Sequence, residues 1–189
     1  MINIYTDGSV VNNAMAGDCW PIGSGGWAAI FYNENGKETW VAGHCDKTTN
    51  QRMELRAVVG ALQYLREKYT NLSELDISFH CDSTYVLDLA QGKINIKSNL
   101  DLAAVFLELI DGLTLHWYWV KSHSGIVGNE KADKLARGFA KRKLHTEVAD
   151  GSVGDKTWME LGINKGERVR AALLINVLRK RIMQLERQK

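Results

Sequence analysis

The sequence lacks any hydrophobic run long enough to cross a membrane, and it lacks a recognisable secretory signal. No stretch approaches the roughly 18 to 20 consecutive apolar residues that a membrane helix needs. The first five residues, Met-Ile-Asn-Ile-Tyr, do not form the basic segment followed by a longer apolar one that marks a secretory signal. Membrane proteins and exported proteins are therefore not expected classes for this chain.

Cysteine is scarce, since only Cys19, Cys45 and Cys81 occur among 189 residues. An odd number of widely spaced cysteines predicts neither a disulfide framework nor a zinc site. Free thiols fit a reducing compartment, so we expect a cytoplasmic location.

Internal repeats and low-complexity segments are also missing, and the length suits one domain with an appendage. Hydrophobic residues make up 45% of the chain, which is enough for a core. The net charge of +2 is unevenly distributed. Residues 160–189 contain eight Lys or Arg and three acidic residues, a net +5, which leaves −3 for residues 1–159. An acidic body with a basic tail indicates a polyanionic partner, although a solvated tail is the plainer alternative.

The hydrophobic pattern predicts strands alternating with helices. Short alternating runs predict strands over residues 2–6, 27–32, 38–44, 75–81 and 113–120, with a polar loop over 7–25 and a hairpin turn at Asn33–Gly36. Helical spacing predicts helices over residues 50–69, 83–91, 100–110, 129–143 and 165–187. Thr49 or Asn50 is the expected cap of the first helix, and Asn129 of the fourth. Three consecutive strands followed by alternating elements favour an α/β fold with a mixed sheet covered by helices.

Four acidic residues stand at positions where such a fold gathers functional groups. Asp7 and Asp82 follow predicted strands, Glu54 lies near the start of a predicted helix, and Asp133 lies on a later helix. Sites in open α/β sheets form outside the carboxyl ends of the strands. Taken singly, each acid is equally consistent with a turn former or with a charge that favours a helix start.

The segments around these acids are more specific than the acids themselves. Asp7 stands in Thr-Asp-Gly-Ser, Glu54 in Thr-Asn-Gln-Arg-Met-Glu-Leu, Asp82 in Asp-Ser-Thr-Tyr-Val, and Asp133 ends His-Ser-Gly-Ile-Val-Gly-Asn-Glu-Lys-Ala-Asp. In this order they resemble the type 1 ribonuclease H family over roughly residues 2–143. The resemblance implies a five-stranded mixed sheet, in strand order 3-2-1-4-5, with helices on both faces. It divides the chain into a catalytic domain over residues 1–144 and a basic helical C-terminal extension over residues 145–189.

The resemblance implies an endonuclease that cuts the RNA strand of RNA–DNA hybrids and leaves 5′-phosphate and 3′-hydroxyl ends. Asp7, Glu54, Asp82 and Asp133 would hold two Mg²⁺ ions, with Mn²⁺ as a candidate substitute. Magnesium prefers hard oxygen ligands, and two ions can clamp the attacking and leaving oxygens of a phosphodiester. Carboxylates that close repel one another, so we expect a strained site without metal. By the same resemblance His123 assists proton transfer or product departure, while a solvent-exposed loop histidine is the alternative.

Several neutral residues beside the acids are candidates for substrate contact. The 2′-hydroxyl distinguishes RNA from DNA because it both donates and accepts hydrogen bonds, and backbone and amide groups can contact it and the phosphates without base preference. The candidates are Gly8, Ser9, Asn50, Gln51, Thr84 and Asn129, together with Asn13, which matches a phosphate-contacting asparagine of the family loosely.

The chain departs from the best-known bacterial pattern in three segments. Residues 14–24 lengthen a loop near the expected site, and residues 92–99 lack the basic protrusion with which some relatives grip the hybrid. Residues 145–189 extend beyond the family core, and their basic helix is our hypothesis for the missing grip. Alternatively, the stripe of Leu174, Leu178, Ile182 and Leu185 docks on the body or pairs with a second copy of the chain. No obligate protein partner is expected.

Two other readings remain open at this point. Integrases, transposases and junction resolvases carry acidic sites on similar sheets, so the fold alone does not decide among nucleases. Glu54 on a helix and the loop that carries His123 favour ribonuclease H. A hybrid-binding protein without catalytic activity is the alternative from another class, and it predicts the loss of at least one of the four acids.

Overall fold

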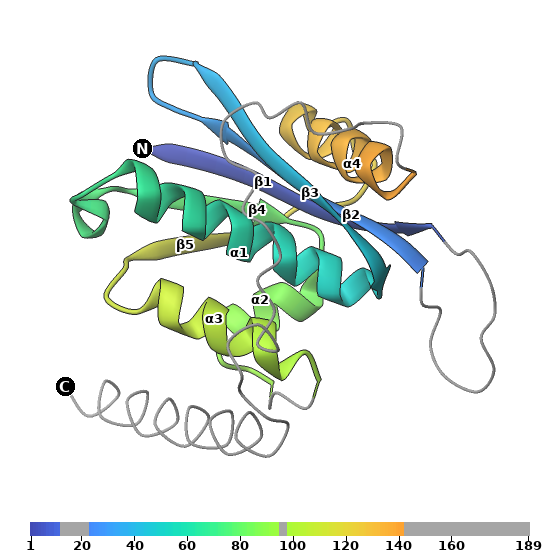
Figure 1. Ribbon diagram of the computed structural model, residues 1–189. Coiled ribbons are helices and arrows are strands. Elements are labelled where there is room, and N and C mark those ends of the chain that lie inside the picture. Colours follow the sequence, from blue (N-terminus) through green and yellow to red (C-terminus); the bar gives the residue numbers. More distant parts are fainter. Residues whose placement is uncertain (12–22, 95–97, 142–189) are drawn as a thin grey trace.

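The computed structural model describes residues 1–11, 23–94 and 98–141, which form a five-stranded sheet with helices on both faces (Figure 1). The strands are β1 (Ile2–Val11), β2 (Gly23–Tyr32), β3 (Glu38–Thr48), β4 (Ile77–Cys81) and β5 (Leu115–Trp119). Their order is β3-β2-β1-β4-β5, as predicted. Strand β1 pairs antiparallel with β2 and parallel with β4, so the sheet is mixed.

The helices are α1 (Asn50–Lys68), α2 (Thr84–Ala90), α3 (Leu100–Ile110) and α4 (Val127–Ala140), with a 3₁₀ helix at Leu72–Glu74. Helix α1 begins after Thr49, whose hydroxyl accepts a hydrogen bond from the Arg52 N–H. Helix α3 has the predicted bounds. The prediction for α4 is wrong at its start, because Ile126 is its N-cap and Asn129 lies buried in its first turn.

Strands β1 and β2 extend into the segment that the sequence pattern predicts to be a polar loop. That prediction is wrong at both ends, since β1 continues to Val11 and β2 begins at Gly23. A Cβ on Gly25 would lie 2.2 Å from Thr48 Cγ2, and one on Gly26 would lie 2.2 Å from the Ala136 carbonyl oxygen. The glycine-rich run is therefore a strand because neighbouring elements press directly on its backbone, which a local pattern does not reveal.

The two faces of the sheet carry separate cores. On one face Ile4, Leu55, Leu62 and Phe79 are fully buried in the main core, which α1 and α3 help to form. Complete burial of such a side chain contributes about 1.5 to 3 kcal/mol. On the other face Ala28 and Ala42 pack with Ala136 and Phe139 of α4 in a smaller core. Strands β1 and β2 are thus held between α1 and α4, and this fixes both helices relative to the sheet.

Four rings from four neighbouring strands form a row across the sheet, which we call the ring row. Tyr32 of β2 meets Tyr5 of β1 edge to face, with centroids 5.9 Å apart. Tyr5 stacks on His80 of β4 at 4.6 Å, and His80 stacks on Tyr118 of β5 at 5.1 Å. A Cβ on Gly128, in the first turn of α4, would lie 2.3 Å from the Tyr5 ring. The ring row therefore meets the start of α4 at Tyr5.

None of the helices in the described ranges is both long and apolar enough to cross a membrane. Of the lengthened loop over 14–24, residues 14–22 lie outside the described residues, as do Asn13 and Cys19. So does the predicted extension over residues 145–189, including its helix and its apolar stripe. The proposed division into two domains and the self-association of the extension therefore stay predictions.

Candidate active site

The first two acids lie where two parallel strands separate. The ladder between β1 and β4 ends at the pair Thr6 and Cys81, and Asp7 and Asp82 are the next residues of each chain segment. The prediction that Asp7 follows the end of its strand is wrong, because β1 continues past it and pairs Asp7 with Ala28 of β2. Asp7 and Asp82 are the first residues beyond the parallel ladder, so the two carboxylates lie at the same edge of the paired strands.

Helix α1 brings Glu54 to this edge. The Glu54 side chain is buried, with 8% of the residue exposed. Its Oε2 accepts a hydrogen bond from the Gly8 N–H at 3.1 Å, and its Oε1 accepts one from Asn50 Nδ2 at 3.3 Å. These contacts within the chain hold both oxygens of the Glu54 carboxylate in place.

Asp7, Glu54 and Asp82 form a compact acidic cluster. Each offers a carboxylate oxygen, and these oxygens lie within 4.8 Å of one another. Burial, followed by the negative charges of Asp82 and Asp133, raises the pKa of Asp7 to about 8. Burial and the charges of Asp7 and Asp82 raise the pKa of Glu54 well above its usual value. The cluster therefore retains protons that isolated carboxylates would lose at neutral pH.

The loop after β5 contacts Asp82 directly. The Ser122 hydroxyl donates a hydrogen bond to Asp82 Oδ2, and Trp119 Nε1 donates one to the Asp82 carbonyl oxygen at 3.2 Å. Ser122 immediately precedes His123 in the chain. Sequence reasoning missed this contact because Ser122 and Asp82 are 40 residues apart in the chain.

Asp133 belongs to a neighbouring group on α4. Its carboxylate, the His123 ring and the Glu130 carboxylate offer ligand atoms within 4.8 Å of one another. Arg137, one turn further along α4, makes an ion pair with Asp133 in which Nε lies 2.7 Å from Oδ1. Asp133 also contributes to the raised pKa of Asp7, which links the two groups electrostatically.

The candidate substrate contacts differ in their relation to the acidic cluster. Gly8 and Asn50 touch Glu54, and Ser9 follows Gly8 on β1. Gln51 and Thr84 are exposed in the first turns of α1 and α2. Asn129 is 3% exposed, and its Oδ1 has no hydrogen-bond partner among the described residues.

The donor set of the acidic cluster suits a hard divalent cation. Three carboxylates supply only oxygen ligands, as Mg²⁺ and Mn²⁺ prefer. Burial raises the pKa values of Asp7 and Glu54 first, the repulsion from neighbouring acids adds to this, and a bound cation would offset the repulsion. Asp7, Glu54 and Asp82 are therefore the residues best placed to hold a metal, and Asp133, whose charge acts on Asp7, is the candidate for a fourth ligand.

Comparisons with known proteins agree with this geometry. A family model described as RNase H matches residues 1–141. The chain is 40% identical to Ribonuclease H of Ehrlichia ruminantium over 147 residues, which cover 71% of this chain and 90% of that protein. It is 35% identical to Ribonuclease HI of Xylella fastidiosa over 162 residues, 77% of this chain and 96% of that protein. The fold is similar to a crystal structure of LC11-RNase H1 in complex with an RNA/DNA hybrid, with a TM-score of 0.63, 21% identity, and coverage of 77% of this chain and all of that one.

Proposed function

The chain belongs to the ribonuclease H family, and we propose on this premise that it hydrolyses the RNA strand of RNA–DNA hybrids with two bound divalent cations. The observation that carries the proposal is the acidic cluster, in which Asp7, Glu54 and Asp82 present oxygens within 4.8 Å of one another. Raised pKa values in such a cluster are typical of a site arranged for a charged ligand rather than for fold stability.

Asp7, Glu54, Asp82 and Asp133 are the proposed metal ligands. Mg²⁺ is the proposed ion, with Mn²⁺ as a substitute, because both accept carboxylate oxygens. Bound there, the ions would supply an activated water and would stabilise the leaving 3′-oxygen. The Gly8 N–H and the Asn50 amide hold Glu54 in place for this task.

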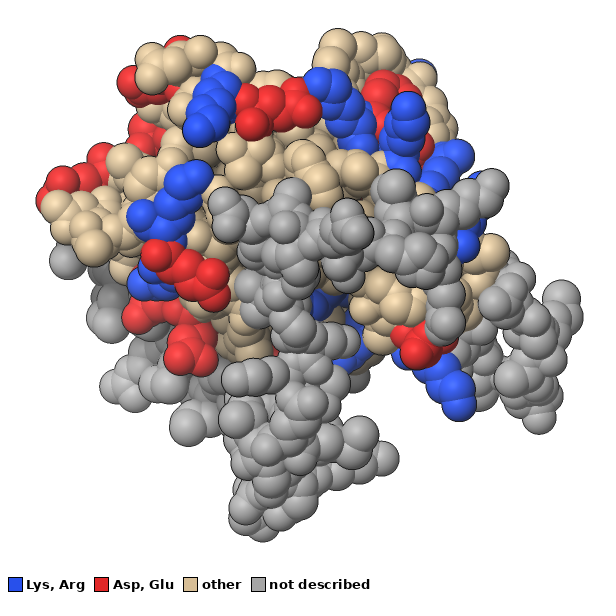
Figure 2. All heavy atoms as spheres, turned by 45° about the horizontal axis from the view of Figure 1, so that its top comes forward, with Lys and Arg blue, Asp and Glu red and all other residues tan. Residues whose placement is uncertain are grey.

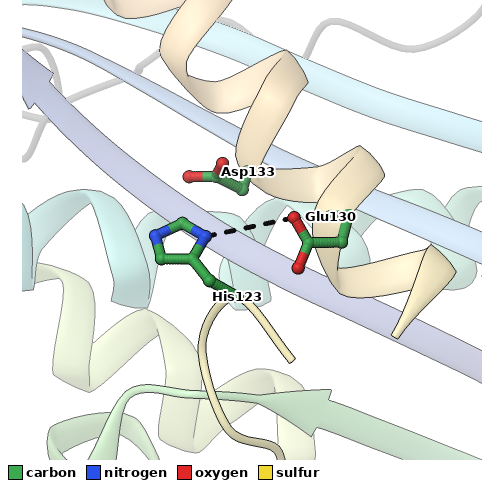
Figure 3. A group of neighbouring side chains, drawn as sticks. All are labelled: His123, Glu130 and Asp133. Carbon is green, nitrogen blue, oxygen red and sulfur yellow. Dashed lines mark ion pairs between the residues drawn. The ribbon is translucent and has the colours of Figure 1, made fainter. Parts of the chain in front are cut away.

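His123 is the proposed proton-handling residue. It lies in the loop between β5 and α4, beside Glu130 and Asp133 (Figure 3). An imidazole exchanges protons near neutral pH, which suits transfer at a phosphodiester. A reaction in which water attacks the phosphorus and the 3′-oxygen leaves would give 5′-phosphate and 3′-hydroxyl ends.

Gly8, Ser9, Asn50, Gln51, Thr84 and Asn129 are the proposed contacts to the RNA backbone, and Asn13 is a further one outside the described residues. Gln51 and Thr84 are exposed, whereas Asn129 is buried, with 3% of the residue accessible. Gln51→Ala should therefore raise the Michaelis constant for a hybrid more than Asn129→Ala does.

The hold on the substrate is proposed to depend partly on the basic C-terminal segment. In the view of Figure 2, the Lys and Arg side chains of the described residues are interspersed with Asp and Glu side chains. Residues 160–189 carry a net +5, and phosphate neutralisation is the main source of affinity without sequence preference. Michaelis constants of the full chain and of a chain ending at Arg142 should be compared at two salt concentrations. Equal constants and equal salt slopes would contradict this part of the proposal.

The central test is cleavage of a labelled RNA–DNA hybrid. We expect cleavage with Mg²⁺, none with EDTA, and none for Asp7→Asn, with mass spectrometry of the fragments giving 5′-phosphate ends. Asp76→Asn is the matched control, because Asp76 is an exposed acid beside β4 that pairs with His116. Hybrid binding without cleavage would favour the non-catalytic alternative, and cleavage of duplex DNA would favour another nuclease of the same superfold.

We propose that this activity belongs to the cytoplasm. Cys45 and Cys81 are free thiols, a state that a reducing compartment maintains. The proposed partner is the RNA–DNA hybrid itself, and self-association through the C-terminal segment is left to a measurement of mass in solution.

A further inference from the structure

The loop between β5 and α4 is held against α4 by specific contacts. Within it His123 has a φ of +51°, a conformation that is uncommon for a residue other than glycine. Glu130 Oε1 accepts a hydrogen bond from the Gly125 N–H at 3.3 Å, which ties the loop to the first turn of α4. A conformation of this kind persists only where its surroundings enforce it. The contacts of the His123 ring therefore indicate which role the loop holds it for.

The two ring nitrogens of His123 have partners of opposite character. Nδ1 lies 3.9 Å from Glu130 Oε2, on the side where Figure 3 shows the ion pair. Nε2 lies 3.2 Å from Arg137 Nη2. A guanidinium has only donors, so this contact is a hydrogen bond only if Nε2 accepts it. The proton of the neutral ring is then on Nδ1, facing a carboxylate.

Arg137 contacts Asp133 as well as His123. Its Nε lies 2.7 Å from Asp133 Oδ1, so one guanidinium bridges the imidazole and a proposed metal ligand. Glu130, Asp133 and Arg137 follow one another at spacings of three and four residues, which places them on one face of α4. The other face is fixed in the sheet core by Ala136 and Phe139. The Arg137 side chain, which contacts both His123 and Asp133, therefore projects from a helix that packing against the sheet holds in place.

We propose that Arg137 is a positioning residue, which holds the His123 ring with Nε2 unprotonated and with Nδ1 toward Glu130. The inference rests on the proposed function, in which His123 handles a proton. In this arrangement the Nε2 lone pair accepts the Arg137 hydrogen bond, so Nε2 can take up a proton once that hydrogen bond opens, and the Glu130 carboxylate beside Nδ1 stabilises the imidazolium that results. Without Arg137 the ring can rotate or can place its proton on Nε2, and the accepting atom is lost.

The arrangement can be measured directly in the metal-free full-length protein. Long-range ¹H–¹⁵N correlation spectra report which ring nitrogen of a neutral histidine carries the proton, and comparison with His123→Ala assigns the signals among the five histidines. We expect the proton on Nδ1 in the wild type and in Arg137→Lys, which keeps a donor-only group. We expect a shift toward Nε2–H in Arg137→Gln. A proton on Nε2 in the wild type, or no change in Arg137→Gln, would overturn the proposal.

Kinetics at saturating Mg²⁺ separate action through His123 from action through Asp133. Arg137→Gln should lower kcat about tenfold, as loss of a residue that orients a site group does, while KM stays within about twofold. In a His123→Ala background the same substitution should have no further effect on kcat, because the residue it positions is gone. Lys134→Gln removes an exposed cation from the same helix and should leave kcat unchanged.

The outcomes distinguish a failure of the role of Arg137 from a failure of the proposed function. An equal fall in kcat with and without His123 would show that Arg137 acts through Asp133 or through folding, and would overturn the inference alone. An unchanged kcat in His123→Ala would overturn the proton role in the proposed function, and the spectra would still decide whether Arg137 orients the ring. Absence of hybrid cleavage by the wild type would overturn the proposed function itself.

Discussion

The backbone N–H of Gly8 donates a hydrogen bond to Oε2 of Glu54 at 3.1 Å, which joins residues 46 positions apart in the chain. The two segments approach so closely that a Cβ on Gly8 would lie 2.2 Å from the Glu54 backbone nitrogen. Only glycine permits this approach of β1 and α1. The contact therefore sets the depth at which the Glu54 carboxylate enters the acidic cluster.

Gly8→Ala should displace α1 from β1, because the atoms that the new Cβ meets are backbone atoms. We expect a loss of about 1 to 3 kcal/mol in the free energy of unfolding, as for other overpacked sites. The cleavage rate should fall about 10²-fold, since misplacing a site group by about 1 Å has that effect. Urea unfolding and initial rates on a labelled hybrid measure the two quantities.

Gly36→Ala is the matched control for loss of stability. Gly36 lies in the β2–β3 turn with a φ of +69°, and nothing lies within 4 Å of a Cβ built there. Its backbone strain should cost about 1 to 2 kcal/mol. The cleavage rate of the folded variant should match the wild type. An equal fall in rate for both variants would mean that activity follows stability and not the position of Glu54.

Asp7→Asn should stabilise the metal-free protein increasingly as the pH rises. The pKa of Asp7 is raised from 3.8 to about 8 by burial first and then by Asp82 and Asp133, so the folded state holds its proton more tightly than the unfolded state does. The stability that this proton gives is complete below pH 3.8 and is lost as the pH rises through about 8. Asn stays neutral throughout. Thermal unfolding in EDTA at pH 5, 7 and 9 measures the difference, and a difference independent of pH would contradict the assignment.

His80 should make the protein less stable on acidification. Burial in the ring row lowers the pKa of His80 from 6.5, so the unfolded chain takes up this proton first as the pH falls. The stability contributed by neutral His80 is therefore present at pH 7.5 and is lost as the pH falls below about 6.5. His80→Phe keeps a ring in the row and cannot be protonated. The wild type should lose more unfolding free energy than His80→Phe between pH 7.5 and 5, and equal losses would refute the prediction.

Arg52 and Asp101 should be energetically coupled. Arg52 Nη1 donates to Asp101 Oδ1 at 2.7 Å, and Nη2 donates to Oδ2, so the pair joins the first turns of α1 and α3 through two hydrogen bonds. About one fifth of each side chain is exposed (21% and 20%), so solvent screens the pair less than a surface ion pair. A double-mutant cycle with Arg52→Gln and Asp101→Asn should give a coupling of about 1 to 3 kcal/mol in urea unfolding. A coupling energy near zero would contradict the prediction and would show that the pair stabilises the fold no more than an exposed ion pair does.

The order of elements could be predicted from the sequence because hydrophobic periodicity is a local signal, whereas the strand order was implied by the resemblance of the motifs to the ribonuclease H family. Helix α3 has the predicted bounds because Gly112 follows it with a φ of +71°, a turn that glycine favours. The lengths of β1 and β2 were not predictable in this way, since packing of other segments on Gly25 and Gly26 makes that run a strand. Asn129 looks like a cap in the sequence, yet α4 begins two residues earlier.

The same distinction holds for the candidate site. The four acids follow from their motifs, but the contacts of Ser122 with Asp82 and of Arg137 with His123 depend on how strand ends and a loop meet in space. Neither pair is close enough in the chain, at separations of 40 and 14 residues, for a helical or strand period to suggest it. Long-range pairs of this kind are determined by the packing of β5 and α4.

Helix α4 is the last described element, and it packs against β1, the first strand of the chain. Its end is tied to β2 by a hydrogen bond of 2.7 Å from the Ser24 hydroxyl to the Ala140 carbonyl oxygen. Asp133 therefore comes near Asp7 only when α4 has packed against the sheet. A nascent chain whose α4 is still inside the ribosome lacks Asp133 at the acidic cluster. During translation, the proposed nuclease would stay silent until almost its whole catalytic portion had emerged.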